Sequence, residues 1–225
     1  IAVIVAMSSE KRQVEALLEE REEVQAGPFN CITGSLCGNR IVLMQCGIGK
    51  VNAAAGATEI INRFRPDAIV STGVAGGLDN VLRVMDVVVS RTITYHDLWC
   101  GPGCERGEVQ GLAKSFEGDR DMLRRAVALP TETRIHPGLI VTGDRFITSR
   151  EELEEIKTAF PEALAVDMES GAIAQVALLY GVPFISFRII SDTPGAEGHQ
   201  QQYEGFWERM AESSFGITRL FLESL

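Results

Sequence analysis

The stretch Phe184-Ile185-Ser186-Phe187-Arg188-Ile189-Ile190-Ser191-Asp192 is apolar for most of its length and stops at a serine and an acid. A short apolar run with these bounds predicts a buried β-strand. In open α/β proteins, ligands bind outside the carboxyl ends of the strands. The stretch therefore indicates an α/β fold in which Asp192 stands where a ligand would bind, as a candidate general acid.

Two further carboxylates follow apolar runs in the same way. Glu10 comes after the opening run 1–6, and Glu169 closes the run 163–169. Carboxylates at three strand ends predict a site that stabilises positive charge and moves protons. Structural alternatives stay open, because Glu169 would also suit a helix N-terminus and Asp192 could cap a helix or pair with Arg188.

Strand-like runs alternate with helix-like patterns along nearly the whole chain, which is typical of an α/β protein. Strands are expected at 1–6, 32–38, 41–46, 68–72, 86–95, 138–142 and 184–192, with a hairpin turn at Gly38-Asn39. Helices are expected from Ser8 or Ser9 to Glu20, and at 51–64, 119–128, 149–160 and 168–180, the last buried on all sides. A C-terminal helix would place Tyr203, Trp207, Met210, Ile217 and Phe221 on one stripe. We predict one α/β domain over residues 1–225, with a mixed, mostly parallel central sheet flanked by helices.

Charge and composition exclude several classes of partner. The 225 residues carry a formal net charge of −10, which argues against nucleic acid and anionic membranes as partners. No apolar run reaches the roughly 18–20 residues of a membrane helix. The chain opens on a strand without a signal-peptide pattern, and Ile at position 1 suggests that preceding residues were removed. Five cysteines without framework spacing favour free thiols and a cytoplasmic location.

Two glycine-rich turns follow expected strands. Gly47-Ile48-Gly49-Lys50 begins like a phosphate loop but lacks the spacing of a P-loop or a dinucleotide fingerprint. It predicts a tight strand-to-helix turn that could line a ligand site with Ile48. The second turn, 72–77, contains Ala75 and Gly76, whose small size would let a flat ligand lie against the main chain. A turn that serves packing alone explains this segment equally well.

Metal and hydrolase motifs are weak. His96, Cys100 and Cys104 have the spacing H-x₃-C-x₃-C, but no second pair of ligands accompanies them. No G-x-S-x-G elbow is present either. We therefore predict neither a metal site nor a cofactor.

The motifs taken in order resemble those of the purine nucleoside phosphorylase/hydrolase superfamily, and most closely the 5′-methylthioadenosine/S-adenosylhomocysteine nucleosidases. The matching segments are 6–10, 47–50, 72–77, 95–97, 143–147, 166–169 and 188–192. The resemblance implies a nucleoside phosphorylase-like fold and hydrolysis of the N-glycosidic bond of these adenine thionucleosides. It further implies a homodimer, a place in methionine salvage and no cofactor.

The resemblance also assigns roles to residues. Glu10 would activate the attacking water, Asp192 would protonate purine N7, and Arg188 would lie near the water. Asp192 must then hold a proton near neutral pH. Substrate binding would fall to Ile48, Ala75, Gly76, Phe146, Ile147, Met168, Glu169, Ser191, Tyr203 and Phe206, with Glu169 on the ribose hydroxyls, Met168 on the sugar, Phe146 and Ile147 on the base, and Tyr203 and Phe206 over the 5′ group.

Some positions depart from the family pattern, and rival functions remain. Asp167 replaces the usual Glu, Val74 replaces a frequent Ser, and segment 98–112 differs where the family forms its 5′ pocket across a dimer interface. A futalosine hydrolase would share the ribose and N7 machinery. A purine nucleoside phosphorylase would need cations for phosphate, for which Arg188 and Lys50 are candidates. A non-catalytic nucleoside-binding protein would be expected to lack one of the three acids.

Overall fold

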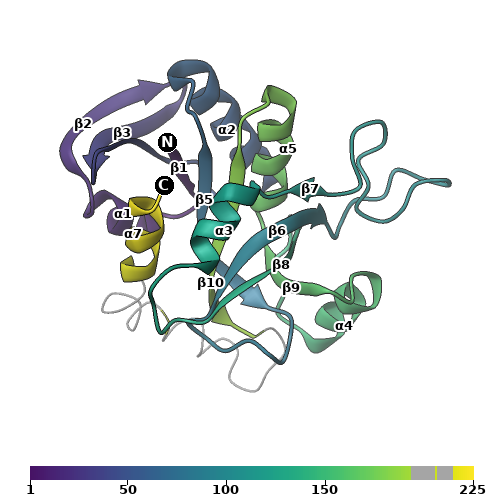
Figure 1. The fold of residues 1–225 in the computed structure, drawn as a ribbon. Helices are drawn as coiled ribbons and strands as arrows, with labels where there is room; N and C mark the ends of the chain where they lie inside the picture. Colours follow the sequence, from purple (N-terminus) through teal and green to yellow (C-terminus); the bar gives the residue numbers. More distant parts are fainter. Residues whose placement is uncertain (194–205, 207–214) are drawn as a thin grey trace.

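A ten-stranded mixed sheet organises the chain in a computed structural model that describes residues 1–193, 206 and 215–225 (Figure 1). The strands are β1 Ala2–Val5, β2 Glu19–Ala26, β3 Phe29–Leu36, β4 Asn39–Gln45, β5 Ile69–Gly77, β6 Val87–Tyr95, β7 Phe116–Glu117, β8 Ile135–Thr142, β9 Ala163–Asp167 and β10 Phe184–Asp192. The helices are α1 Ser8–Glu15, α2 Lys50–Phe64, α3 Arg120–Val127, α4 Arg150–Ala159, α5 Ser170–Tyr180 and α7 Phe215–Glu223.

Two groups of parallel strands form the centre of the sheet. β4, β1, β5 and β10 run parallel to one another, and β6, β8 and β9 form the second group. Antiparallel pairs join β10 to β6 and β9 to β5, so that five strands close a circuit. A further antiparallel run, β2–β3–β4, extends the sheet at its other end. The predicted mixed α/β fold is confirmed.

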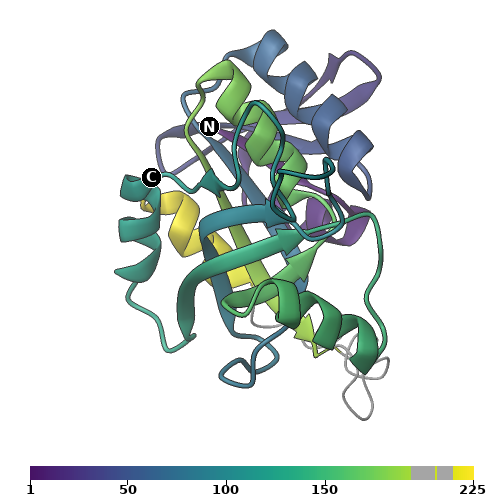
Figure 2. The same cartoon turned by 90° about the vertical axis from the view of Figure 1, so that its right-hand side faces the viewer.

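Helices cover the sheet and bury its central strands. α2 and α5 pack against each other in both views, and α1 lies against α7 (Figures 1 and 2). Every residue of β10 is buried, as expected for a strand covered on both faces. The ring of Phe187 stacks on that of Phe221 from α7 at 4.9 Å, which fixes the C-terminal helix on the sheet. Tyr203, Trp207 and Met210 of the predicted stripe lie outside the described residues.

The N-terminal third differs from the sequence prediction. The first helix ends at Glu15 instead of Glu20, and its N-cap is Met7 rather than a serine. Residues 19–26 form β2, which is the outer strand of the described sheet and mostly exposed. Its glutamates favour helix locally, but pairing with β3 decides the structure, and charges on an edge strand discourage further pairing. The β3–β4 hairpin is confirmed, but its turn is Cys37-Gly38, both at positive φ, and not the predicted Gly38-Asn39, because Asn39 already pairs with Leu36.

The prediction that the helix over 168–180 is buried on all sides is wrong for its last turn. Residues 170–174 are buried, whereas Leu178, Leu179 and Tyr180 are 51%, 62% and 47% exposed. The sequence pattern could not separate these two parts, because both are apolar. Within the described part of the chain, no helix combines the length and apolar character needed to cross a bilayer.

Candidate functional site

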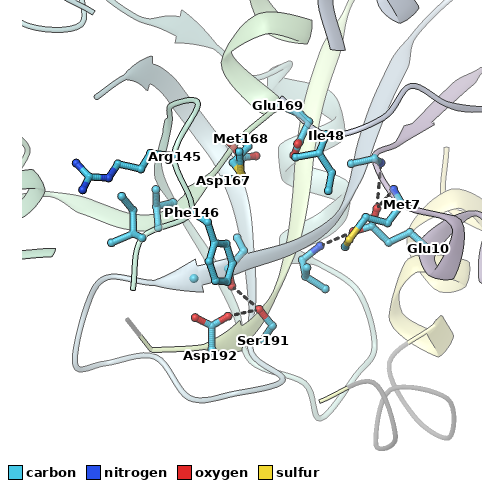
Figure 3. A pocket seen from close by; sticks show the side chains of 16 residues that line it. Met7, Glu10, Ile48, Arg145, Phe146, Asp167, Met168, Glu169, Ser191 and Asp192 are labelled. Atoms are coloured by element: carbon cyan, nitrogen blue, oxygen red, sulfur yellow. Dashed lines mark hydrogen bonds between the residues drawn. The ribbon is translucent and has the colours of Figure 1, made fainter. Parts of the chain in front are cut away.

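A cavity opens where several strands end, as the position of Asp192 predicts (Figure 3). Its walls come from the ends of β1, β5, β9 and β10 and from the segments that follow β4 and β8. The lining residues are Ala6, Met7, Glu10, Ile48, Val74, Ala75, Gly76, Arg145, Phe146, Ile147, Val166, Asp167, Met168, Glu169, Ser191 and Asp192. Glu10, Glu169 and Asp192 are thereby brought to one site, although Glu10 and Asp192 are 182 positions apart in the sequence.

Glu10 is held in place by the main chain of two segments. One carboxylate oxygen accepts the N–H groups of Ala6 at 3.0 Å and Met7 at 2.9 Å, and the other accepts that of Val74 at 3.0 Å. The side chain is 1% exposed. Burial raises the pKa of Glu10, and the positive charge of Arg188 and the three N–H groups oppose that rise. The result is an oriented carboxylate with a raised proton affinity.

Glu169 lies at the N-cap of α5 and reaches the turn before α2. Its Oε1 accepts the N–H of Gly49 at 2.9 Å. Burial raises its pKa to about 7, the neighbouring Asp167 adds to the rise, and Arg188 lowers it. Glu169 is thus a carboxyl group that changes its charge near neutral pH.

Arg188 lies behind the cavity wall and is fully buried. Its Nε donates to Asp167 Oδ2 at 2.8 Å, and its Nη2 donates to Ser71 Oγ at 2.8 Å and Ser170 Oγ at 3.1 Å. It is not among the described residues that line the cavity. Arg188 therefore acts on the cavity carboxylates by charge and by positioning Asp167. The shorter Asp167 side chain still reaches the guanidinium.

Ser191 and Asp192 end β10 and point into the cavity. The Ser191 hydroxyl is hydrogen-bonded to Asp192 Oδ1 and lies 3.3 Å from the carbonyl oxygen of Ala75. Both side chains are buried, with Asp192 2% exposed. The serine thereby fixes one oxygen of the carboxyl group at the cavity wall.

Phe146 and Ile147 come from the loop after β8. Phe146 is 52% exposed and Ile147 is buried in a small core cluster, so that the ring stands at the rim of the cavity. Ile48 is also half exposed and lines the cavity, together with Ala75, Gly76 and Met168.

Two predicted lid aromatics are not part of the cavity as described. Tyr203 lies outside the described residues. Phe206 has no exposed surface and belongs to the core cluster that contains Phe187 and Phe221. The structure thus places Phe206 in the interior rather than among the described lining residues.

Sequence reasoning did not assign a role to several lining residues. Met7 and Arg145 lie in the family motifs 6–10 and 143–147, beside Glu10 and Phe146. This position in the motifs could have predicted that they line the cavity. Val74 and Asp167 appeared only as departures from the family pattern. Ala6 and Val166 carry no sequence signal beyond their place in apolar strands.

Gly47-Ile48-Gly49-Lys50 is the strand-to-helix turn that the sequence predicts. Gly47 and Gly49 both have a φ of 95°, a conformation that favours glycine. The Lys50 ammonium is bonded to Asp97 at 2.7 and 2.8 Å. A lysine engaged in this way does not present its charge as a phosphate-binding group would.

The His96, Cys100 and Cys104 pattern does not converge on a metal site. No group of three or more metal-ligating side chains occurs in the described residues. His96 is 5% exposed, and its Nε2 has no hydrogen-bond partner among the residues described. All five cysteines are free thiols.

The family model described as the phosphorylase superfamily matches residues 1–223. A 5′-methylthioadenosine/S-adenosylhomocysteine nucleosidase of Desulfotalea psychrophila is 36% identical over 228 residues, covering 100% of this chain and 97% of the relative. The chain therefore belongs to the phosphorylase superfamily and, within it, to the family of 5′-methylthioadenosine/S-adenosylhomocysteine nucleosidases, as its motifs predict.

Solved structures agree with this placement. The nucleosidase of Neisseria meningitidis in complex with methylthio-immucillin-A has a TM-score of 0.93 and 36% identity, covering 100% of this chain and 98% of that one. The futalosine hydrolase of Helicobacter pylori has a TM-score of 0.91 at 26% identity, covering 100% and 97%. The rival hydrolase thus shares the fold at lower sequence identity.

Proposed function

We propose that this protein hydrolyses the N-glycosidic bond of 5′-methylthioadenosine and S-adenosylhomocysteine, releasing adenine and the 5′-thioribose. The observation that carries the proposal is the set of three carboxyl groups, Glu10, Glu169 and Asp192, in one buried cavity. Breaking this bond builds positive charge on the ribose and negative charge on the departing purine. Carboxylates stabilise the first, and a proton donor neutralises the second.

Glu10 is the residue that activates water in this proposal. Its carboxylate is fixed by three N–H groups and has a raised pKa, so it can take a proton from a water molecule at the anomeric carbon. Arg188 carries positive charge close to this carboxylate and limits the rise of its pKa. Water activated on one side of the sugar and acid on the other corresponds to the inverting glycosidase arrangement.

Asp192 is the general acid, and purine N7 is the atom it protonates. Ser191 orients the Asp192 carboxyl group, which lines the cavity and carries the proton to the base. Phe146 stacks on the purine from the rim, and the main chain of Ile147 bonds its edge. Ala75 and Gly76 provide the flat wall against which the ring lies.

Glu169 binds the ribose 2′ and 3′ hydroxyl groups, and Met168 packs against the sugar. The Gly49 N–H leaves the second oxygen of Glu169 available for the ribose. A carboxylate facing the ring also stabilises positive charge on the sugar in the transition state.

Water rather than phosphate is the nucleophile. A phosphorylase must present unpaired cations to phosphate, but Lys50 is bonded to Asp97 and Arg188 to Asp167. Glu10 occupies the position next to the anomeric carbon, where its negative charge would repel phosphate.

A substrate panel tests the function. Purified protein is incubated with methylthioadenosine, S-adenosylhomocysteine, futalosine and inosine, with and without phosphate, and the released base and sugar are separated chromatographically. We expect adenine and free methylthioribose from methylthioadenosine at the same rate in both buffers. Strict dependence on phosphate would establish a phosphorylase, and preference for futalosine would establish the rival hydrolase. Binding without turnover of any substrate would establish a nucleoside-binding protein.

We further propose that the protein is a homodimer and is located in the cytoplasm. Val51 and Trp99 are 79% and 63% exposed, and these apolar side chains support the proposal of a contact with a second copy. Tyr203 is proposed to cover the 5′ substituent. The five free thiols support a reducing compartment. Sedimentation at micromolar concentration tests the dimer, and a monomer would contradict it.

A further inference from the structure

The acid in the segment Tyr95-His96-Asp97 has no role in the mechanism above, and it is not among the described residues that line the cavity. Its carboxylate nevertheless contacts two segments that do line it. The two oxygens of Asp97 accept hydrogen bonds from Lys50 Nζ at 2.8 and 2.7 Å. Oδ2 also accepts the main-chain N–H of Asp144 at 2.8 Å.

Asp97, Lys50 and Asp144 form a closed ring. Asp144 Oδ1 accepts the main-chain N–H of Lys50 at 2.7 Å, so each of the three residues is bonded to the other two. They come from the end of β6, the start of α2 and the loop after β8. Charge-assisted hydrogen bonds that close a ring fix three segments relative to one another more firmly than a single pair would.

The start of α2 carries the ribose side of the cavity. Gly49 directly precedes Lys50, and its N–H bonds Glu169 Oε1 at 2.9 Å. A side chain at Gly49 would lie 3.0 Å from Asp144 Oδ1, which shows how closely the ring packs against this turn. A shift of Lys50 would therefore move the group that orients Glu169.

The loop after β8 carries the base side of the cavity. Phe146 and Ile147 follow Asp144 within three positions. The far end of the loop is fixed by Glu152, whose Oε2 accepts the N–H groups of Thr148 and Ser149 at 3.0 and 3.1 Å. Asp97 fixes the beginning of the same loop in the same way, by accepting the main-chain N–H of Asp144.

We propose that Asp97 is a positioning residue for the nucleoside: it sets the distance between the Glu169 carboxylate on the ribose side and the wall of Phe146 and Ile147 on the base side. This inference rests on the proposed function of the cavity. Burial would raise the pKa of Asp97, but the bonds from Lys50 and the Asp144 N–H outweigh it and lower the pKa. Asp97 therefore keeps its negative charge at neutral pH.

Two substitutions at Asp97 separate its two contacts. Asp97→Ala removes both, whereas Asp97→Asn keeps an oxygen for the Asp144 N–H and loses the ion pair with Lys50. Asp79→Ala is a matched control, because Asp79 pairs with Lys157 at 3.0 Å and the two side chains are 31% and 23% exposed, against 28% and 25% for Asp97 and Lys50. Asp79 is not a described lining residue of the cavity.

The experiment measures KM and kcat for methylthioadenosine, the calorimetric Kd for adenine, and Tm. For Asp97→Ala we expect KM and the adenine Kd to rise about 10-fold, the order of one lost hydrogen bond, with a smaller change in kcat. Asp97→Asn should fall between Asp97→Ala and the unaltered protein. Asp79→Ala should change Tm alone.

Two outcomes would overturn the inference. One is a lower Tm for both Asp97 variants with unchanged KM and adenine Kd, which would make Asp97 a purely structural residue. The other is an equal rise in KM for Asp79→Ala. Failure of the proposed function would be seen separately, because the unaltered protein would then release no adenine. In that case the adenine Kd of the Asp97 variants still tests the role of the ring.

Discussion

The side chains of Arg188 and Glu10 both lie close to Gly73, where a Cβ atom would otherwise be. A Cβ atom built at Gly73 would collide with Glu10 Oε1 and would lie 2.6 Å from Arg188 Nη1. The positive charge of Arg188 consequently lies close to the carboxylate proposed to activate water, and it lowers the pKa that burial raises. Absence of a side chain at position 73 is what allows the two groups to approach.

Gly73→Ala should disrupt this approach. The added methyl group must displace Glu10 or Arg188, which we expect to cost about 1–3 kcal/mol of stability and to reduce kcat strongly. Thermal unfolding and adenine release measure both effects. Gly216→Ala in α7 is the control, because among the described residues no atom outside its own helix lies within 4 Å of the added carbon. Full activity of Gly73→Ala would show that the position of Glu10 is not critical.

Arg188→Met should shift the pH dependence of the reaction. Arg188 lowers the pKa of both Glu10 and Glu169, so its removal raises both values. The ionised form of Glu10 would then appear only at higher pH, and the acidic limb of kcat/KM should move upward. Arg188→Lys, which keeps the charge, should shift the limb less.

The same substitution should also destabilise the fold. Asp167 would lose its buried partner, which costs about 3–5 kcal/mol. Profiles are therefore recorded on protein that denaturant titration shows to be folded. An acidic limb that stays in place in folded Arg188→Met would contradict the electrostatic role.

Asp192→Asn should lower turnover by roughly 10²–10⁴-fold, the range for a lost general acid. The carboxamide keeps the size of the side chain and its contact with Ser191, so KM should change little. Steady-state adenine release gives both values. Near-normal turnover would remove Asp192 from the mechanism.

Glu169→Gln should stabilise the protein above neutral pH while abolishing most activity. Burial raises the pKa of Glu169 to about 7 in the folded state, above the usual 4.5 of a glutamate side chain. A carboxyl whose pKa is raised by folding gives its full stabilisation below the unfolded pKa and loses it as pH rises through the folded pKa. The neutral amide avoids that loss, so the Tm difference should be large at pH 8 and small near pH 4.5. A Tm difference independent of pH would contradict the raised pKa.

Local signals in the sequence were sufficient for much of the fold. The helices expected at 119–128 and 149–160 and the apolar strand ending at Asp192 appear in the structure, and the two helices begin after the N-caps Asp119 and Ser149. The prediction that the first helix reaches Glu20 was wrong. Glutamates favour helix locally, whereas the pairing of β2 with β3 is a non-local interaction that the local sequence does not show. The prediction that Leu178, Leu179 and Tyr180 are buried was wrong for a similar reason. Burial depends on what packs against a helix and not on the composition of the helix.

The strand that ends at Asp192 and the family of the chain follow from the sequence alone, because apolar runs and motifs of neighbouring residues carry this information. The three-dimensional structure was needed to place Glu10 in the first turn of α1 and Glu169 at the N-cap of α5. It was also needed to show which charges neutralise one another: Arg188 with Asp167, and Lys50 with Asp97. These pairs span 21 and 47 positions, and their geometry arises when β10, β9, β6 and α2 come together.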